Sequence, residues 1–166
     1  MVTNFYLNHT LILLLAAAAL VSALPEYLGR PVKRWALPLP GFFASSAALL
    51  MLAYPELSEL WRPQIWLTGF AAGLAGVVRG RYIDMECNQD LNLVRLRRAP
   101  EGLGGAVLLV LFSVIEIAGA LKAGNHGRFE PTMELGMTLV AGLLLGRGIM
   151  CYLQSQKIEH MDQEGL

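Results

Sequence analysis

The sequence predicts an all-α membrane protein, a five-helix transmembrane bundle with a small cytoplasmic β-hairpin between its third and fourth helices. Of the 166 residues, 55% are hydrophobic and only 16% are charged, whereas a soluble domain carries about 25% charged residues. Five apolar segments have about the length that a bilayer crossing requires, namely residues 5–24, 37–54, 64–78, 103–121 and 133–153. The short connections leave no room for a second domain, so we expect one bundle over residues 1–153 and a polar tail over 154–166.

The basic residues predict how the bundle is oriented. Cytoplasmic flanks of membrane proteins collect lysine and arginine. If the N-terminus lies outside, only three of the 13 basic residues lie on the outer side, Arg62, Lys122 and Arg128. We therefore predict an N-out, C-in, multi-pass protein of a bacterial inner membrane. The basic residues on its inner side are Arg30, Lys33, Arg34, Arg79, Arg81, Arg95, Arg97, Arg98, Arg147 and Lys157.

The first two spans carry distinct sequence features. Val21-Ser22-Ala23 at the end of the first span resembles a signal-peptide cleavage site, and cleavage there would leave four spans. Signal peptides have a basic region before their apolar stretch, and no basic residue precedes Leu11, so we expect the first span to be retained. Pro38 and Pro40 lie at the start of the second span, where a missing backbone N–H costs least.

The third span is short, and we expect Arg79 at its end to extend toward the membrane surface. In the insert that follows, residues 79–102, apolar and polar side chains alternate over 82–87 and again over 92–97, with the turn formers Asn88-Gln89-Asp90 between them. This pattern favours a β-hairpin on the inner membrane surface, and an irregular amphipathic loop is the alternative. The residues at its basic end that we expect to contact anionic lipid headgroups are Arg95, Arg97 and Arg98.

Small residues recur at helical spacing on the third and fifth spans. Stripes of this kind let two helix backbones approach closely within a membrane. They serve packing inside one chain or association of two chains, and we expect the first. The glycines concerned are Gly69, Gly73, Gly76 and Gly80 on the third span, and Gly142 and Gly146 on the fifth.

Two charged residues within the spans are the candidate functional residues. Glu116 lies inside the fourth span, where an ionisable side chain normally faces the bundle interior and often has a function. It is either a proton or cation site, or a carboxyl group bonded to another helix or paired with Lys122. Arg147 lies near the inner end of the fifth span, and structural anchoring is the favoured interpretation. Lipid headgroup binding, or pairing with Asp84 or Glu86, is the alternative.

No pattern of catalytic, metal-binding or cofactor-binding residues stands out. The sequence has no nucleophile elbow, P-loop, Rossmann glycine run or HExxH motif. His9 and His126 share the predicted outer face, but their spacing matches no established metal or haem site. Cys87 and Cys151 fall on the predicted cytoplasmic side, where disulfides rarely persist. We expect a protein that is not an enzyme and that needs no cofactor, metal or nucleic acid.

The layout of the chain resembles that of the CcdC-type small bacterial membrane proteins. The resemblance rests on the basic, proline-rich stretch Gly29-Arg-Pro-Val-Lys-Arg-Trp-Ala-Leu-Pro-Leu-Pro40 and on the polar insert over residues 81–98 after a short third span. It extends over about residues 5–150. The association of that family with cytochrome c biogenesis implies an accessory role, and the chain lacks the CxxC and CxxCH motifs of direct thiol or haem chemistry.

These observations favour an accessory or assembly subunit that acts through helix packing with a larger membrane complex, through self-association or through lipid contact. Two alternatives remain open. A small transporter or ion-coupled protein would use Glu116, with Arg147 near its inner mouth. A membrane redox or cytochrome biogenesis factor would need His9 and His126, or the two cysteines, as ligands.

Overall fold

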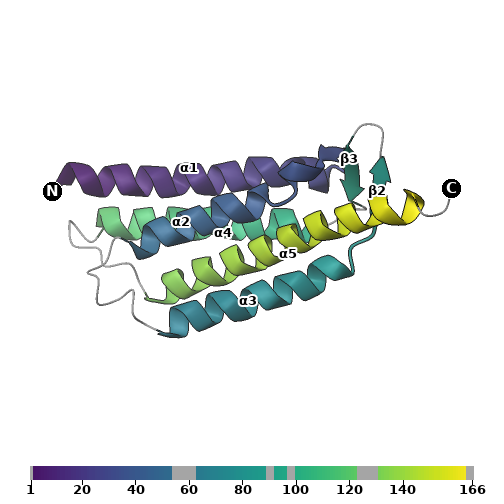
Figure 1. The fold of residues 1–166 in the computed structure, drawn as a ribbon. Helices are drawn as coiled ribbons and strands as arrows, with labels where there is room; N and C mark the ends of the chain where they lie inside the picture. The colour runs from purple at the N-terminus through teal and green to yellow at the C-terminus, as the bar shows by residue number, and fades with distance from the viewer. Residues whose placement is uncertain (1, 54–62, 89–91, 97–99, 123–130, 164–166) are drawn as a thin grey trace.

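The computed structural model of the chain describes residues 2–53, 63–88, 92–96, 100–122 and 131–163. Long helices make up most of it, and a small sheet lies at one end (Figure 1). In chain order the elements are α1 (Val2–Tyr27), β1 (Val32–Lys33), the 3-10 turn η1 (Arg34–Ala36), α2 (Leu39–Leu52), α3 (Pro63–Arg81), β2 (Met85–Asn88), β3 (Leu93–Leu96), α4 (Pro100–Lys122) and α5 (Pro131–Gln163).

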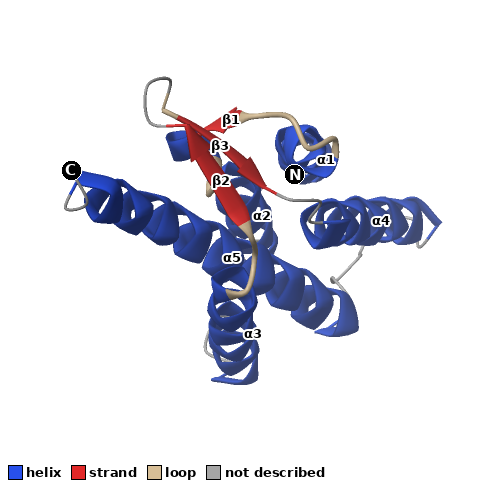
Figure 2. Ribbon diagram, turned by 90° about the vertical axis from the view of Figure 1, so that its right-hand side faces the viewer, coloured by secondary structure: helices blue, strands red, loops and turns tan. Residues whose placement is uncertain are grey.

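Helix α5 is the central helix of the bundle. It packs against α2, α3 and α4, and its contact with α3 is the most extensive between any two elements. Helix α1 completes the bundle by packing on α2 and α4. Seen from the sheet end, α3 lies beyond α5 on the side away from the sheet, so it is the outlying helix (Figure 2).

Within the described part of the chain, four helices are long and apolar enough to cross a membrane. They correspond to the first, second, fourth and fifth predicted spans. The third predicted span, residues 64–78, is helical as part of α3, but α3 is not among these four helices. The mean hydropathy of α3 is lowered by its glycines, by the polar Gln64 and Thr68, and by two arginines at its end. The four apolar segments are Leu7–Tyr27, Arg34–Leu52, Pro100–Gly119 and Thr132–Lys157.

The side chains are distributed as in a membrane bundle, with small residues inside and large apolar residues outside. The core is rich in alanines such as Ala16, Ala44 and Ala47, each fully buried. Phe42 and Phe70, by contrast, are 63% and 68% exposed. Small buried residues let helices approach closely, and large apolar side chains on the outside match a lipid environment. The chain is therefore a helical membrane protein.

A three-stranded antiparallel sheet caps the end of the bundle where α1 and α5 finish, in the strand order β1-β3-β2 (Figures 1 and 2). The predicted hairpin is present as β2 and β3, with Met85 opposite Leu96 and Cys87 opposite Val94. Strand β2 begins at Met85 rather than at residue 82 because α3 continues to Arg81. The sequence did not predict β1, which adds the first connection to the sheet.

A second hydrophobic cluster joins this sheet to the helices. Leu37, Val94, Leu96 and Cys151 are buried in it. Helix α5 continues past residue 153 into the predicted polar tail and ends at Gln163. Glutamine, lysine and glutamate in that stretch are favourable helix formers, so the end of the apolar run at 153 does not end the helix.

Candidate functional site

A buried ion pair lies at the sheet end of the bundle. Arg147 Nη2 on α5 donates a hydrogen bond to Glu26 Oε2 on α1 over 2.8 Å. The two side chains are only 7% and 4% exposed. A buried charge is tolerated when an opposite charge and hydrogen bonds compensate it, so Glu26 explains how an arginine is accommodated in an apolar helix. Pairing with Asp84 or Glu86 was an alternative that the sequence left open, and the structure has Glu26 as the partner instead.

The ends of α1 and α4 position this ion pair. Helix α1 ends at Tyr27, one residue after Glu26, and the chain turns away through Gly29, whose φ of +63° is the left-handed conformation that glycine adopts without strain. In the first turn of α4, Gly102 leaves room for the two side chains. A Cβ atom there would lie 2.5 Å from Arg147 Nη1 and 3.2 Å from Glu26 Oε2. Helices α1, α4 and α5 therefore meet at this pair.

A second ion pair connects α3 to α4. Arg79 Nε, in the last turn of α3, donates over 2.9 Å to both carboxylate oxygens of Glu101 in the first turn of α4, and Arg79 Nη2 contacts Oε1. The pair is exposed, at 59% for Arg79 and 39% for Glu101. The hydrogen bonds to Glu101 raise the pKa of Arg79 above its usual value. Exposed pairs add only about 0–1 kcal/mol to stability, so this pair matters more for where it places two opposite charges.

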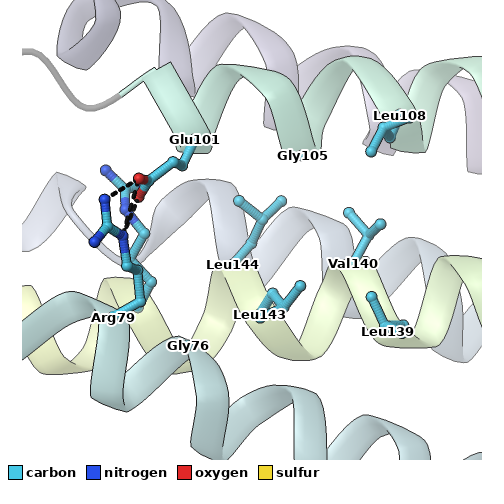
Figure 3. Close-up of a pocket in the computed structure, with 10 residues that line it drawn as sticks. Gly76, Arg79, Glu101, Gly105, Leu108, Leu139, Val140, Leu143 and Leu144 are labelled. Carbon is cyan, nitrogen blue, oxygen red and sulfur yellow. Dashed lines mark hydrogen bonds and ion pairs between the residues drawn. The ribbon is translucent and has the colours of Figure 1, made fainter.

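Both ion pairs lie at one end of an apolar groove between α3, α4 and α5. The groove has a volume of about 380 Å³. Figure 3 shows Glu101 and Arg79 meeting at one end, and the leucine and valine side chains of α4 and α5 continuing away from them. Leu108 and Leu139 at the far end are 46% and 42% exposed, so the groove opens to the outside of the bundle. The lining residues are Gly76, Arg79, Glu101, Gly105, Leu108, Leu139, Val140, Leu143, Leu144 and Arg147.

One polar atom of a residue that lines this groove has no acceptor among the described residues. The buried Nε of Arg147 makes no hydrogen bond to any described residue, although Nη2 of the same side chain binds Glu26. A buried donor left without an acceptor costs about 1–3 kcal/mol. Arg147 lines the groove through other atoms of its side chain, since Nε itself has almost no accessible surface.

The predicted glycine stripes lie in the contact between α3 and α5. Gly146 packs against Gly73, Gly142 against Gly69, and Gly76 and Gly80 against the backbone of α5 near residues 143 and 147. A Cβ at Gly146 would overlap the carbonyl oxygen of Gly73, so no side chain fits there. Among the stripe glycines, Gly73 has the most room, since its Cβ would lie 3.8 Å from the Gly142 oxygen. The contact lies within one chain.

The structure does not bring the other predicted site residues to this groove. Glu116 is half-buried on α4, and it lies about 21 Å along the helix from Gly102, at 1.5 Å per residue. It is therefore far from Arg147, which contacts Gly102. Arg95 on β3 is exposed, and its Nε donates to the Gly29 carbonyl over 2.9 Å. Arg97 and Arg98 lie outside the described residues.

The histidines and cysteines form no ligand set in the described part of the chain. No group of three or more His, Cys, Asp or Glu side chains within it is placed to hold a metal ion. His9 is buried on α1, and His126 lies outside the described residues. Cys151 is buried and Cys87 half-buried in the cluster beneath the sheet.

Sequence reasoning missed Glu26, Glu101 and Gly102. The first two are acids next to a proline, Pro25 and Pro100, at the ends of apolar segments, and this position could have marked them in the sequence. Charged residues at the ends of spans are common, however, and only the fold shows which of them meet. Comparison with known proteins returned no match, whether with family models, with curated proteins or with solved structures.

Proposed function

We propose that the protein is a non-enzymatic accessory subunit of a bacterial inner membrane that holds a membrane lipid in the groove between α3, α4 and α5. The main observation behind this proposal is the groove itself, which has apolar walls and two ion pairs at one end. A phospholipid has the same division into an apolar chain and a charged headgroup. The resemblance to CcdC-type proteins stays a prediction, and the proposal does not rest on it.

The size of the groove supports this proposal. Its volume of about 380 Å³ falls within the range of about 300–1,000 Å³ that is typical of small-molecule sites. From Arg147 to Leu139 it follows α5 for about 12 Å, at 1.5 Å per residue. That length accommodates part of an acyl chain, and the exposed side chains of Leu108 and Leu139 leave a lateral opening through which the rest of the chain reaches the bilayer.

The proposed topology puts the charged end of the groove at the cytoplasmic surface. We take α3 as a fifth, short span with the N-terminus of the chain outside. The described basic residues near the sheet end include Arg30, Lys33, Arg79 and Arg81, and cytoplasmic flanks favour such residues. The lipid would then come from the inner leaflet, whose headgroups lie at this level.

Native mass spectrometry of the protein extracted in mild detergent tests the proposal. We expect one phospholipid to remain bound to the wild-type protein. Leu108→Trp combined with Leu139→Trp narrows the groove and should reduce the retained lipid at least tenfold. Leu14→Trp is the matched control, because Leu14 is 60% exposed on α1, which does not line the groove. Equal retention by the groove variant and the control, or no retention by the wild type, would contradict the proposal.

The accessory role has a separate readout in the same preparation. A subunit of a larger complex should copurify with a stoichiometric membrane partner when a tagged chain is extracted from its native membrane. If the chain retains lipid but copurifies with no partner, the result would support the lipid site and contradict the role as a subunit.

A further inference from the structure

The charges at the end of the groove define which headgroup chemistry fits there, and this inference rests on the proposed lipid site. Arg147 is neutralised by Glu26, and both side chains are almost fully buried. The accessible charges are those of Arg79 and Glu101, one of each sign. The end of the groove is therefore electrically balanced, and a headgroup with one anionic and one cationic group matches it better than a purely anionic headgroup.

We propose that the groove selects a phospholipid with a primary ammonium headgroup, such as phosphatidylethanolamine, with its phosphate on Arg79 and its ammonium on Glu101. A guanidinium has five N–H donors, and its bond to Glu101 uses only the edge with Nε and Nη2. The rest of the exposed Arg79 side chain is open to a phosphate. A carboxylate accepts hydrogen bonds, so Glu101 binds a primary ammonium group with its N–H donors.

This arrangement distinguishes the three common headgroup types. A phosphatidylglycerol headgroup offers a phosphate to Arg79 but nothing cationic to Glu101. A phosphatidylcholine headgroup has a quaternary ammonium without N–H donors, so it cannot hydrogen-bond to Glu101. The hydroxyl groups of phosphatidylglycerol can donate to Glu101 but carry no charge, so only the primary ammonium headgroup offers Glu101 both a positive charge and hydrogen-bond donors.

Competitive lipid binding to the delipidated protein tests the inference, with native mass spectrometry as the readout. Equal amounts of dioleoyl phosphatidylethanolamine, phosphatidylglycerol and phosphatidylcholine are offered together. We expect the wild type to bind the ethanolamine lipid about tenfold better than the other two, a factor within the range of one charge-assisted hydrogen bond. Glu101→Gln should bring the three lipids to within about twofold of one another.

Glu86→Gln is the matched control, since Glu86 is an exposed acid on β2 that does not line the groove, and it should keep the wild-type preference. Thermal unfolding of each variant shows whether it is folded, and the wild-type competition is decisive without any variant. Binding of all three lipids without preference would overturn the proposed headgroup selectivity but would still support the proposed lipid site. Binding of none of them would overturn both.

Discussion

Arg147 illustrates what sequence reasoning can and cannot say about a single residue. An arginine inside an apolar segment is conspicuous, and its need for a partner follows from the cost of burying a charge. Its partner, Glu26, lies 121 residues away on α1. The predicted topology puts Asp84 and Glu86 on the same side of the membrane as Arg147, which made them alternative partners, but local patterns reach only a few residues and do not show which acid lies beside α5. The pairing depends on how α1 and α5 are placed in the bundle.

The buried pair makes a specific prediction for stability. Removing one partner, by Glu26→Gln or by Arg147→Met, leaves the other charged group buried, and we expect a loss of about 3–5 kcal/mol. Replacing both by apolar side chains, with Glu26→Leu and Arg147→Met, should restore most of this loss, because no buried charge then remains. Unfolding of the purified protein in detergent measures the three differences. A double variant no more stable than the single variants would contradict this account of the pair.

At the scale of the elements, the sequence indicated the glycine stripes but not what they contact. Close helix packing follows from glycines at helical spacing, whichever chain supplies the second helix. The fold places α3 and α5 side by side and brings Gly146 against Gly73. The hairpin was likewise predictable, since its alternation is local. Strand β1 was not, because a two-residue strand has no periodicity and Val32 pairs with the distant Val94.

A pair of glycine substitutions tests the contact between α3 and α5. Gly146→Ala would place a methyl group on the Gly73 carbonyl, and overpacking of this kind costs about 1–3 kcal/mol. Gly104→Ala is the control, because a Cβ there meets nothing within 4 Å, and alanine in a helix is about 0.5–1 kcal/mol more favourable than glycine. We expect thermal unfolding in detergent to show a lower Tm for the first and an unchanged or higher Tm for the second. An unaffected Gly146→Ala would mean that α3 does not pack on α5 as described.

At the scale of the whole molecule, composition and apolar segment length predicted a helical membrane protein, and four of the helices agree with that prediction. The groove was not predictable, because its walls come from three helices and its charged end joins Arg79 to Glu101 across 22 residues of sequence. The candidate residue Glu116 was conspicuous in the sequence as an acid inside an apolar span, yet it does not line the groove. Of the two charged residues that were conspicuous within the spans, Arg147 lines the groove and Glu116 does not.

The proposed orientation makes a prediction for the two ends of α5. Thr132 and Lys157 are exposed near its opposite ends and lie about 38 Å apart along the helix, at 1.5 Å per residue. In a background without Cys87 and Cys151, Thr132→Cys should react with a membrane-impermeant maleimide in intact cells. Lys157→Cys should react only after the membrane is opened. The reverse pattern would show that the sheet end of the bundle faces outward.

The central claim is that a lipid chain occupies the groove between α3, α4 and α5. Photo-cross-linking with a phospholipid that carries a diazirine within its acyl chain tests this claim most directly, because the modified peptides report where the chain lies. We predict that adducts concentrate at the apolar residues that line the groove, namely Leu108, Leu139, Val140, Leu143 and Leu144. Adducts spread evenly over lipid-facing positions such as Phe42 and Phe70, which are more exposed than the groove residues, would contradict it.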